Sequence, residues 1–389
     1  MPMKLPTASE MLAKLVGFDT VSRHSNLKLI EFVEEYLAEY GIESQRIAND
    51  DGSKANLLAR IGPNVEGGVV LSGHTDVVPV DGQPWTTDPF TLTARDGKLY
   101  GRGSCDMKGF IACALAEVPD WVGRELSRPI WLAFSYDEEI GCLGAPRMIE
   151  RMVADCPRPA AVIVGEPTMM RAVTQQKGIT SLKTVVHGVE SHSSQVNQGI
   201  SAIHVAARLV SKIEEIMSEL VQAGCCNPAF NVEHSSLHVG RIHGGTAINI
   251  MARECTFEWE IRHLPEDGFE AVFDRFTAFS NRLEAELQAR DSRFGIETIR
   301  LTPTVPGLAG SGNAEAIALC ERLLGPQQPE AVAYATEAGQ FQQAGIEAII
   351  CGPGSIGQAH QPDEFISQEQ LEQGARFMRK LGERAANEE

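Results

Sequence analysis

Seven side chains that could bind metal ions or transfer protons lie at or just beyond the ends of short apolar runs. They are two imidazoles and five carboxylates: His74, Asp76, Asp106, Glu138, Glu139, Glu166 and His360. In an open α/β sheet, the residues that follow parallel strands meet in one crevice, so distant positions can converge. Oxygen and nitrogen ligands without cysteine are typical of a two-metal hydrolytic centre rather than of a structural zinc site.

The first two motifs allow both a metal-binding and a structural interpretation. In LSGHTDVVP, His74 and Asp76 are two residues apart on an extended strand, so both side chains point the same way. Asp76 could then orient an imidazole that binds a metal, although a solvent-facing loop would show the same pattern. Asp106, in GKLYGRGSCDMKGF, precedes a predicted helix and could either cap it or bridge two cations.

The adjacent acids Glu138 and Glu139 give the sharper signal. They follow a strongly apolar strand, where two neighbouring ionised carboxylates are costly unless a cation compensates them. Glu166, in VIVGEPT, has the same end-of-strand position, and an exposed loop acid is its alternative interpretation. His360 lies in CGPGSIGQAHQPDEF, a loop rich in Gly and Pro that could turn around a ligand or be structural.

The elements that must position these residues follow two patterns. Up to about residue 178, apolar runs such as VVLSG, PIWLAFS and AAVIVG alternate with predicted helices at 25–40, 109–118 and 143–153. A βαββαβ order then predicts a compact α+β unit, with helices at about 200–223 and 267–290. The first pattern then resumes, with AVAYAT and AIICG as expected strands and with expected helices at 313–324 and 368–386.

The fold class predicted from these patterns is α/β with two domains, since 389 residues exceed one ordinary core. We expect residues 1–178 and 304–389 to form one discontinuous domain with a mixed, mostly parallel sheet flanked by helices. Residues 179–303 would form the inserted α+β domain.

Composition narrows the possible environment and partners. The hydrophobic content of 43% and the charged content of 22% are typical of a soluble globular protein. No apolar stretch reaches membrane-helix length and the N-terminus lacks a signal-type apolar core, so we expect a cytoplasmic protein with no membrane partner. Nine cysteines without paired spacing indicate reduced thiols. A net charge of −18 argues against nucleic acid as a partner and favours a small molecule.

Together the motifs resemble the metal-dependent M20 peptidase and deacylase family over almost the whole chain. The segments GHTDVVP, GRGSCDMKG, DEE, GEPT and AHQPDE stand in the order of that family. The resemblance implies a metallopeptidase-like catalytic domain and an inserted lid and dimerisation domain. It also implies two divalent metal ions, with zinc expected and cobalt or manganese compatible with the same ligands.

The resemblance also implies a role for each residue of the motifs. His74 and Glu166 would bind one metal, Glu139 and His360 would bind the other, and Asp106 would bridge them. Asp76 would be the partner of the His74 imidazole. Glu138 would be the general base that activates a bridging water. The family usually has a cis peptide after the bridging aspartate, which here is Asp106–Met107.

Three further residues in the inserted unit resemble family positions. His192 is similar to a histidine that reaches into the active site of a neighbouring subunit, which implies a functional homodimer. Ser191 replaces the glycine usual before it, and a turn capped by serine is the alternative interpretation. Asn249 and Arg262 would face the substrate, and for Arg262 a cross-strand salt bridge is the alternative.

Within the family, the chain looks most like the acetylornithine deacetylases, which release acetate from N2-acetyl-L-ornithine in arginine biosynthesis. In YATEAGQF, Glu337 stands where desuccinylases of succinyl-diaminopimelate carry an acidic residue near an arginine, and here the arginine is absent. Glu337 could pair with the substrate ammonium group. Another M20 N-acyl amino acid amidohydrolase, including the desuccinylase, is the alternative. A binding protein that has lost catalysis is less compatible with the retained Glu138.

Overall fold

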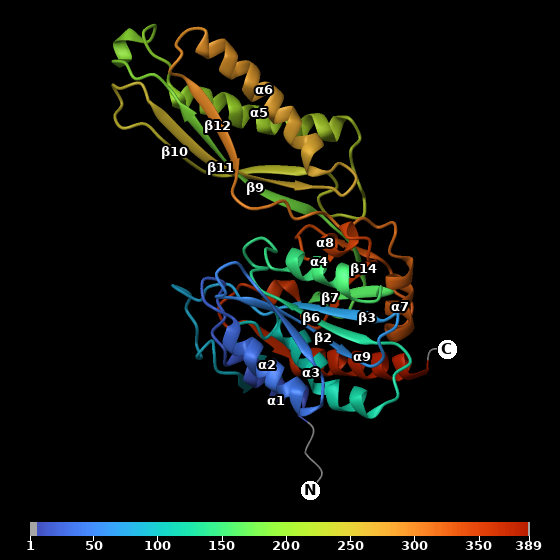
Figure 1. Ribbon diagram of the computed structural model, residues 1–389. Coiled ribbons are helices and arrows are strands. Elements are labelled where there is room, and N and C mark those ends of the chain that lie inside the picture. Colours follow the sequence, from blue (N-terminus) through green and yellow to red (C-terminus); the bar gives the residue numbers. More distant parts are fainter. Residues whose placement is uncertain (1–5, 388–389) are drawn as a thin grey trace. The chain divides into compact units, whose positions relative to one another are not determined.

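The computed structural model describes residues 6–387, which divide into two compact units (Figure 1). The first unit contains the chain up to Gln175, the segment Leu308–Glu330 and the chain from Thr336 onward. The second unit contains Gln176–Gly307 and Ala331–Ala335. In the described part of the chain, no helix combines the length and the apolar character that a membrane crossing requires.

An eight-stranded mixed sheet forms the core of the first unit, and its centre is parallel. In spatial order the strands are β1 (Ser44–Ala48), β2 (Ala55–Ile61), β6 (Ile130–Ser135), β3 (Val69–His74), β7 (Ala161–Pro167), β14 (Ala348–Gly352), β8 (Val173–Gln176) and β13 (Glu330–Val332). Strands β6, β3, β7 and β14 run parallel, whereas β1, β2 and β8 pair antiparallel. The parallel strands are almost wholly buried, as expected for strands covered on both faces. The predicted fold class is confirmed.

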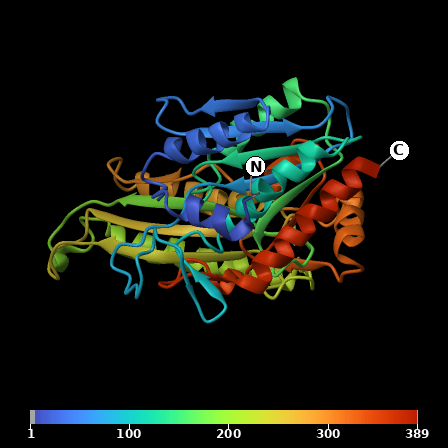
Figure 2. The ribbon, with the colours of Figure 1, turned by 90° about the horizontal axis from the view of Figure 1, so that it is seen from below.

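Helices cover both faces of this sheet (Figure 1). One face carries α1 (Ala8–Val16), α2 (Leu27–Glu39), α3 (Lys108–Gly123) and α9 (Gln368–Asn387). The other face carries α4 (Ala145–Asp155) and α8 (Ala338–Gln343), while α7 (Ala314–Leu324) packs against β7, β14 and α9. Figure 2 looks onto the first face and shows α9, in red, crossing it. The face of α3 that meets the sheet packs Phe110 and Ile111 into the main core.

A small three-stranded sheet joins the C-terminal part of the first unit to its N-terminal part. Its order is β15 (Phe365–Ser367), β5 (Lys98–Tyr100) and β4 (Thr93–Arg95), with both pairs antiparallel. Because β15 pairs with β5, the segment that follows His360 lies beside the segment that leads to Asp106. Residues far apart in the sequence are thereby brought together.

The second unit has the predicted βαββαβ order. Its antiparallel sheet has the spatial order β10 (Ser236–Gly244), β11 (Glu254–His263), β9 (Gly178–His187) and β12 (Gly295–Arg300). Burial alternates along β9 and β11, so one face is apolar. Helices α5 (Ala202–Gln222) and α6 (Phe269–Gln288) cover that face (Figure 1).

The segment AVAYAT differs from its prediction. The strand β13 covers Glu330–Val332 and ends before most of that segment. The Thr336 hydroxyl accepts a hydrogen bond from the Ala338 N–H at 3.0 Å, which satisfies a free donor at the start of α8. This short helix was not expected, and its N-terminal boundary residue is Glu337.

Candidate metal centre

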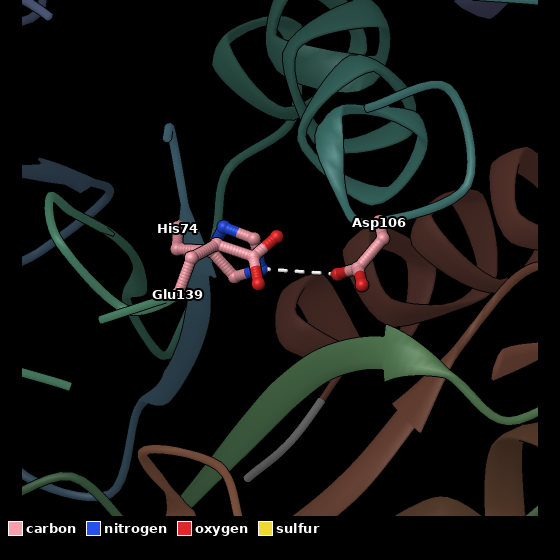
Figure 3. A group of neighbouring side chains, drawn as sticks. All are labelled: His74, Asp106 and Glu139. Carbon is pink, nitrogen blue, oxygen red and sulfur yellow. Dashed lines mark hydrogen bonds and ion pairs between the residues drawn. The ribbon is translucent and has the colours of Figure 1, made fainter. Parts of the chain in front are cut away.

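The carboxyl ends of the parallel strands place most of the predicted ligands at one edge of the first unit. His74 ends β3, and Glu166 lies near the end of β7. Glu139 follows β6 in a turn, and Asp106 lies just before α3. Figure 3 shows His74 facing Asp106, with Glu139 beside the imidazole. The convergence expected for an open α/β sheet is therefore present.

The two oxygens of Asp106 face different imidazoles. Oδ1 lies 3.1 Å from Nε2 of His74, and Oδ2 lies 3.3 Å from Nε2 of His360. Nε2 of His74 is also 3.6 Å from Oε1 of Glu166, and Nε2 of His360 is 3.0 Å from Oε2 of Glu139. One carboxylate thus joins two groups of donors, each of which contains an imidazole and a further acid.

A second way of grouping the donors includes Glu138. Ligand atoms of His74, Asp106 and Glu139 lie within 4.8 Å of one another, and so do those of His74, Glu138 and Glu166. The family resemblance implies a base rather than a ligand at Glu138, whereas the distances allow either role. The donors are carboxylate oxygens and imidazole nitrogens, which suit zinc and related divalent ions.

The carboxyl groups of the cluster outnumber the imidazoles beside them. Burial raises the pKa of Glu138 and of Glu166 well above the usual glutamate value, and neighbouring carboxylates raise both further. Burial, together with the charge of Asp106, raises the pKa of Glu139 to about 7. Ionising several carboxylates this close together costs free energy unless a cation compensates their charge. The residues present therefore fit a divalent metal site.

The two histidines respond to the same excess of negative charge. Burial opposes the protonation of His74, but its hydrogen bond with Asp106 and the nearby glutamates outweigh burial and raise its pKa well above 6.5. Hydrogen bonds with Asp106 and Glu139 raise the pKa of His360 to about 10. Burial would raise the pKa of Asp106, but the hydrogen bonds from His360 and His74 lower it. A bound cation would replace these protons.

Asp76 supports the cluster mainly through the loop after β6. Its Oδ1 accepts the Glu138 N–H at 3.1 Å and its Oδ2 accepts the Glu139 N–H at 3.3 Å. The Ser22 hydroxyl also donates to Oδ2 at 2.7 Å. The His74 Nδ1 lies 2.9 Å from the main-chain carbonyl of Asp76 and 3.7 Å from its Oδ1. The closer contact to the imidazole is therefore made by the backbone rather than by the carboxylate.

Glu364 holds the Asp106 loop, and the sequence motifs had not indicated this role. Its Oε1 accepts the N–H groups of Cys105 at 2.9 Å and Asp106 at 3.0 Å. Its Oε2 accepts the Gly103 N–H at 3.1 Å and pairs with Nη1 of Arg102 at 2.7 Å. The Arg102 and Glu364 side chains are each 1% exposed. The predicted cis peptide at Asp106–Met107 is present in this loop.

The Glu337 side chain is buried close to the cluster. It is 1% exposed, and its Oε2 accepts the Ser72 hydroxyl at 3.0 Å. Burial raises its pKa, with the charge of Asp76 adding to the effect. The pKa of Glu138 is raised in part by the charge of Glu337, so the two carboxylates are near enough to interact. Glu337 belongs to the same unit as the metal-binding candidates.

His192, Asn249 and Arg262 all lie in the second unit. His192 Nδ1 lies 2.8 Å from the Ser194 hydroxyl and accepts the Ser194 N–H, so the histidine itself caps this turn, whereas the alternative interpretation expected a serine cap. The Asn249 carbonyl accepts the Ser193 N–H at 3.0 Å. Nε of Arg262 pairs at 2.7 Å with Glu260 of the same strand, β11, rather than across strands as the alternative expected. Their roles toward a substrate stay predictions.

Comparisons with known proteins agree with this geometry. Residues 70–384 match the model described as Peptidase family M20/M25/M40. An acetylornithine deacetylase from Pasteurella multocida is 35% identical, covering 97% of this chain and 98% of its own. One from Yersinia pseudotuberculosis is 36% identical, covering 94% of each chain.

Solved structures share the fold at low sequence identity. Aminopeptidase PepT from Bacillus cereus has a TM-score of 0.75 at 16% identity, covering 99% of both chains. An M20 family metallo-carboxypeptidase from Sulfolobus solfataricus has a TM-score of 0.72 at 18% identity, covering 98% of this chain and 99% of that one. The chain belongs to the M20 peptidase family, as predicted, and is a hydrolase of the amidohydrolase type.

Proposed function

We propose that the protein removes the acetyl group from N2-acetyl-L-ornithine and that it uses two divalent metal ions. The observation that carries the two-ion site is the position of Asp106, whose oxygens lie 3.1 Å and 3.3 Å from the imidazoles of His74 and His360. A carboxylate between two donor groups is suited to bridging two ions. The names of the similar curated proteins support the acetylated substrate.

The proposed chemistry is the attack of water on an acyl carbonyl. When bound, two divalent ions would polarise that carbonyl and lower the pKa of a water molecule. Glu138 accepts the proton of the water and then delivers it to the departing amine, which is otherwise a poor leaving group. His74 and Glu166 would hold one ion, Glu139 and His360 would hold the other, and Asp106 would be shared between them. Zinc is the proposed metal, with cobalt as the alternative.

Glu337 is the proposed determinant of the amino-acid specificity. Its buried carboxylate near Glu138 suits the terminal ammonium group of ornithine better than a second carboxylate. The second candidate function is another M20 N-acyl amino acid amidohydrolase, such as the desuccinylase of succinyl-diaminopimelate. The missing arginine in YATEAGQF argues against a succinyl substrate.

The second unit is proposed to act as a lid and as the dimerisation domain of a cytoplasmic homodimer. His192 would stabilise the oxyanion in the active site of the other subunit, while Asn249 and Arg262 would contact the substrate. His192 is exposed, and within the described residues its ring makes hydrogen bonds through Nδ1, not through Nε2. That nitrogen is therefore available to a ligand.

A small substrate panel tests the proposed function. Hydrolysis of acetylornithine, acetylmethionine and succinyl-diaminopimelate should be measured in the purified protein, with and without added zinc or cobalt. We expect the highest kcat/KM on acetylornithine and a clear dependence on metal. Faster hydrolysis of the succinyl compound would favour the second candidate, and hydrolysis by the metal-free protein would refute the mechanism.

The role of Glu138 gives a separate prediction. Glu138→Ala should lower kcat by roughly 10²–10⁴-fold, because the proton acceptor is lost. Metal content, measured by elemental analysis, should stay near two ions per chain. Glu139→Ala is the matched control, since it removes the neighbouring acid and should instead reduce metal content. Loss of a metal ion from Glu138→Ala would identify Glu138 as a ligand.

A further inference from the structure

The carboxylate of Glu138 receives one hydrogen bond from a side chain within the described residues. The donor is the thiol of Cys142, whose Sγ lies 3.3 Å from Oε1 of Glu138. The loop backbone is fixed separately, since the Glu138 N–H donates to Asp76. The two contacts hold different parts of Glu138: Asp76 holds its main chain, and Cys142 holds its side chain.

Cys142 is itself tightly held. It is 3% exposed, and its backbone has a positive φ of 51°, which is uncommon for a residue with a side chain. Its N–H donates to the Glu138 carbonyl at 2.8 Å, closing the turn that carries both residues. Its carbonyl accepts the side-chain amide of Gln340 in α8 at 3.0 Å. The thiol therefore has little freedom to move away from Glu138.

We propose that Cys142 is a positioning residue for Glu138: its thiol holds Oε1 and leaves Oε2 to accept the proton of the attacking water. This inference rests on the proposed function. A free carboxylate rotates about a broad terminal torsion, so either oxygen could face the water. A donor bound to one oxygen restricts that rotation, and correct orientation of a reacting group contributes to rate.

The weakness of the thiol as a donor suits this position. A lysine or arginine at the same place would favour the ionised carboxylate so strongly that Glu138 would become a poor base. A neutral thiol is a weak donor and orients the group with a smaller effect on its basicity. Cys142 thus differs from the supports of Asp106, where Arg102 and Glu364 form a buried ion pair.

Three variants separate positioning from a structural role. Cys142→Ala removes the donor, and Cys142→Ser replaces it with a hydroxyl donor. Cys113→Ala is the matched control. Cys113, in α3, is also buried, and its thiol donates to the carbonyl of Leu371, in α9, at 3.4 Å. Each variant is purified with its metal, and kcat, KM for acetylornithine, metal content and thermal stability are measured.

We expect Cys142→Ala to lower kcat roughly tenfold with KM within about twofold, as for an interaction that matters in the transition state. Its metal content should equal that of the wild type. Cys142→Ser should recover most of kcat, and Cys113→Ala should keep full activity. If Cys142→Ala lost metal, its low kcat would have a second cause, and Cys142→Ser would then be the deciding variant. A near-normal kcat in Cys142→Ser supports the inference, and a tenfold lower kcat overturns it.

Full kcat in Cys142→Ala would also overturn the inference while leaving the proposed function intact. Failure of the proposed function can also be distinguished from failure of this inference. A wild-type protein that hydrolyses no acetylated amino acid with either metal would refute the proposed function itself, whatever the cysteine variants did.

Discussion

At the scale of single residues, the site is organised by carboxylates with different tasks. Asp106 joins the two donor groups, whereas Asp76 and Glu364 accept backbone N–H groups and so fix the loops that carry other acids. Carboxylates that accept backbone donors in buried surroundings are strongly held. The same residue type therefore serves as a candidate ligand, a candidate base and a support, and its hydrogen-bond partners distinguish these tasks.

Glu337 gives a prediction at this scale. Glu337→Gln should raise KM for acetylornithine far more than KM for acetylmethionine, because only the first substrate carries a terminal ammonium group. The amide can still accept from Ser72, so the fold should be kept. Michaelis constants on both substrates provide the measurement. Equal effects on both would mean that Glu337 has only a structural role.

Residue types and order were enough to predict the metal-binding candidates, since their positions after apolar strands indicate convergence. The role of Glu364 could not be predicted in the same way. Its four contacts depend on the pairing of β15 with β5, which brings Glu364 to a loop more than 250 residues earlier. Although Glu364 closes the AHQPDE segment, nothing in the neighbouring sequence reveals that its partner is the Asp106 loop. The cluster was predictable, whereas its supports required tertiary structure.

At the scale of elements, the loop between β5 and α3 depends on that distant acid. Glu364→Gln should lower the free energy of unfolding by roughly 3–5 kcal/mol, because Arg102 would remain buried without its charge partner. Metal affinity should fall as well, since the Asp106 N–H loses part of its support. Chemical denaturation and metal titration provide the two measurements.

A surface pair supplies the control for Glu364→Gln. Asp291 pairs with the exposed Arg293, so Asp291→Asn should leave the free energy of unfolding nearly unchanged. A similar small change in Glu364→Gln would show that the Asp106 loop holds its conformation without the buried acid.

The helix predictions succeeded where amphipathic patterns were long, as for α5 and α6. The strand expected at AVAYAT forms only at its start, because β13 ends at Val332 and the Thr336 hydroxyl then accepts an N–H at the start of α8. A hydrogen bond of this kind decides between a strand and a helix over only a few residues. Short elements next to the site were therefore the least predictable part of the fold.

At the scale of the whole molecule, metal binding should control stability. In the protein without metal, burial and neighbouring charges raise the pKa values of Glu138, Glu139 and Glu166. An acid whose pKa is higher in the folded state binds protons on folding, so its contribution to stability falls as pH rises above 4.5, the ordinary glutamate value. The raised pKa values of the two histidines act in the same direction.

We therefore expect the chelated protein to lose stability as pH rises from 4.5 through about 7, the raised pKa of Glu139, and on toward about 10, the raised pKa of His360, and the metal-loaded protein to change much less. The lowered pKa of Asp106 acts oppositely, but only below its ordinary value of 3.8. Calorimetric Tm values of both forms across this range provide the measurement, with re-addition of zinc as the control for reversibility. Parallel pH profiles for the two forms would contradict the prediction.

The first unit is assembled from both ends of the chain, with the second unit between them. During translation, His74, Asp106, Glu139 and Glu166 leave the ribosome early, whereas His360 and Glu364 follow only after the whole intervening unit. A nascent chain consequently carries an incomplete cluster of acids and one imidazole until residue 360 has been made. Metal capture should therefore be a late event in the maturation of the protein, after the last strand of the sheet has docked.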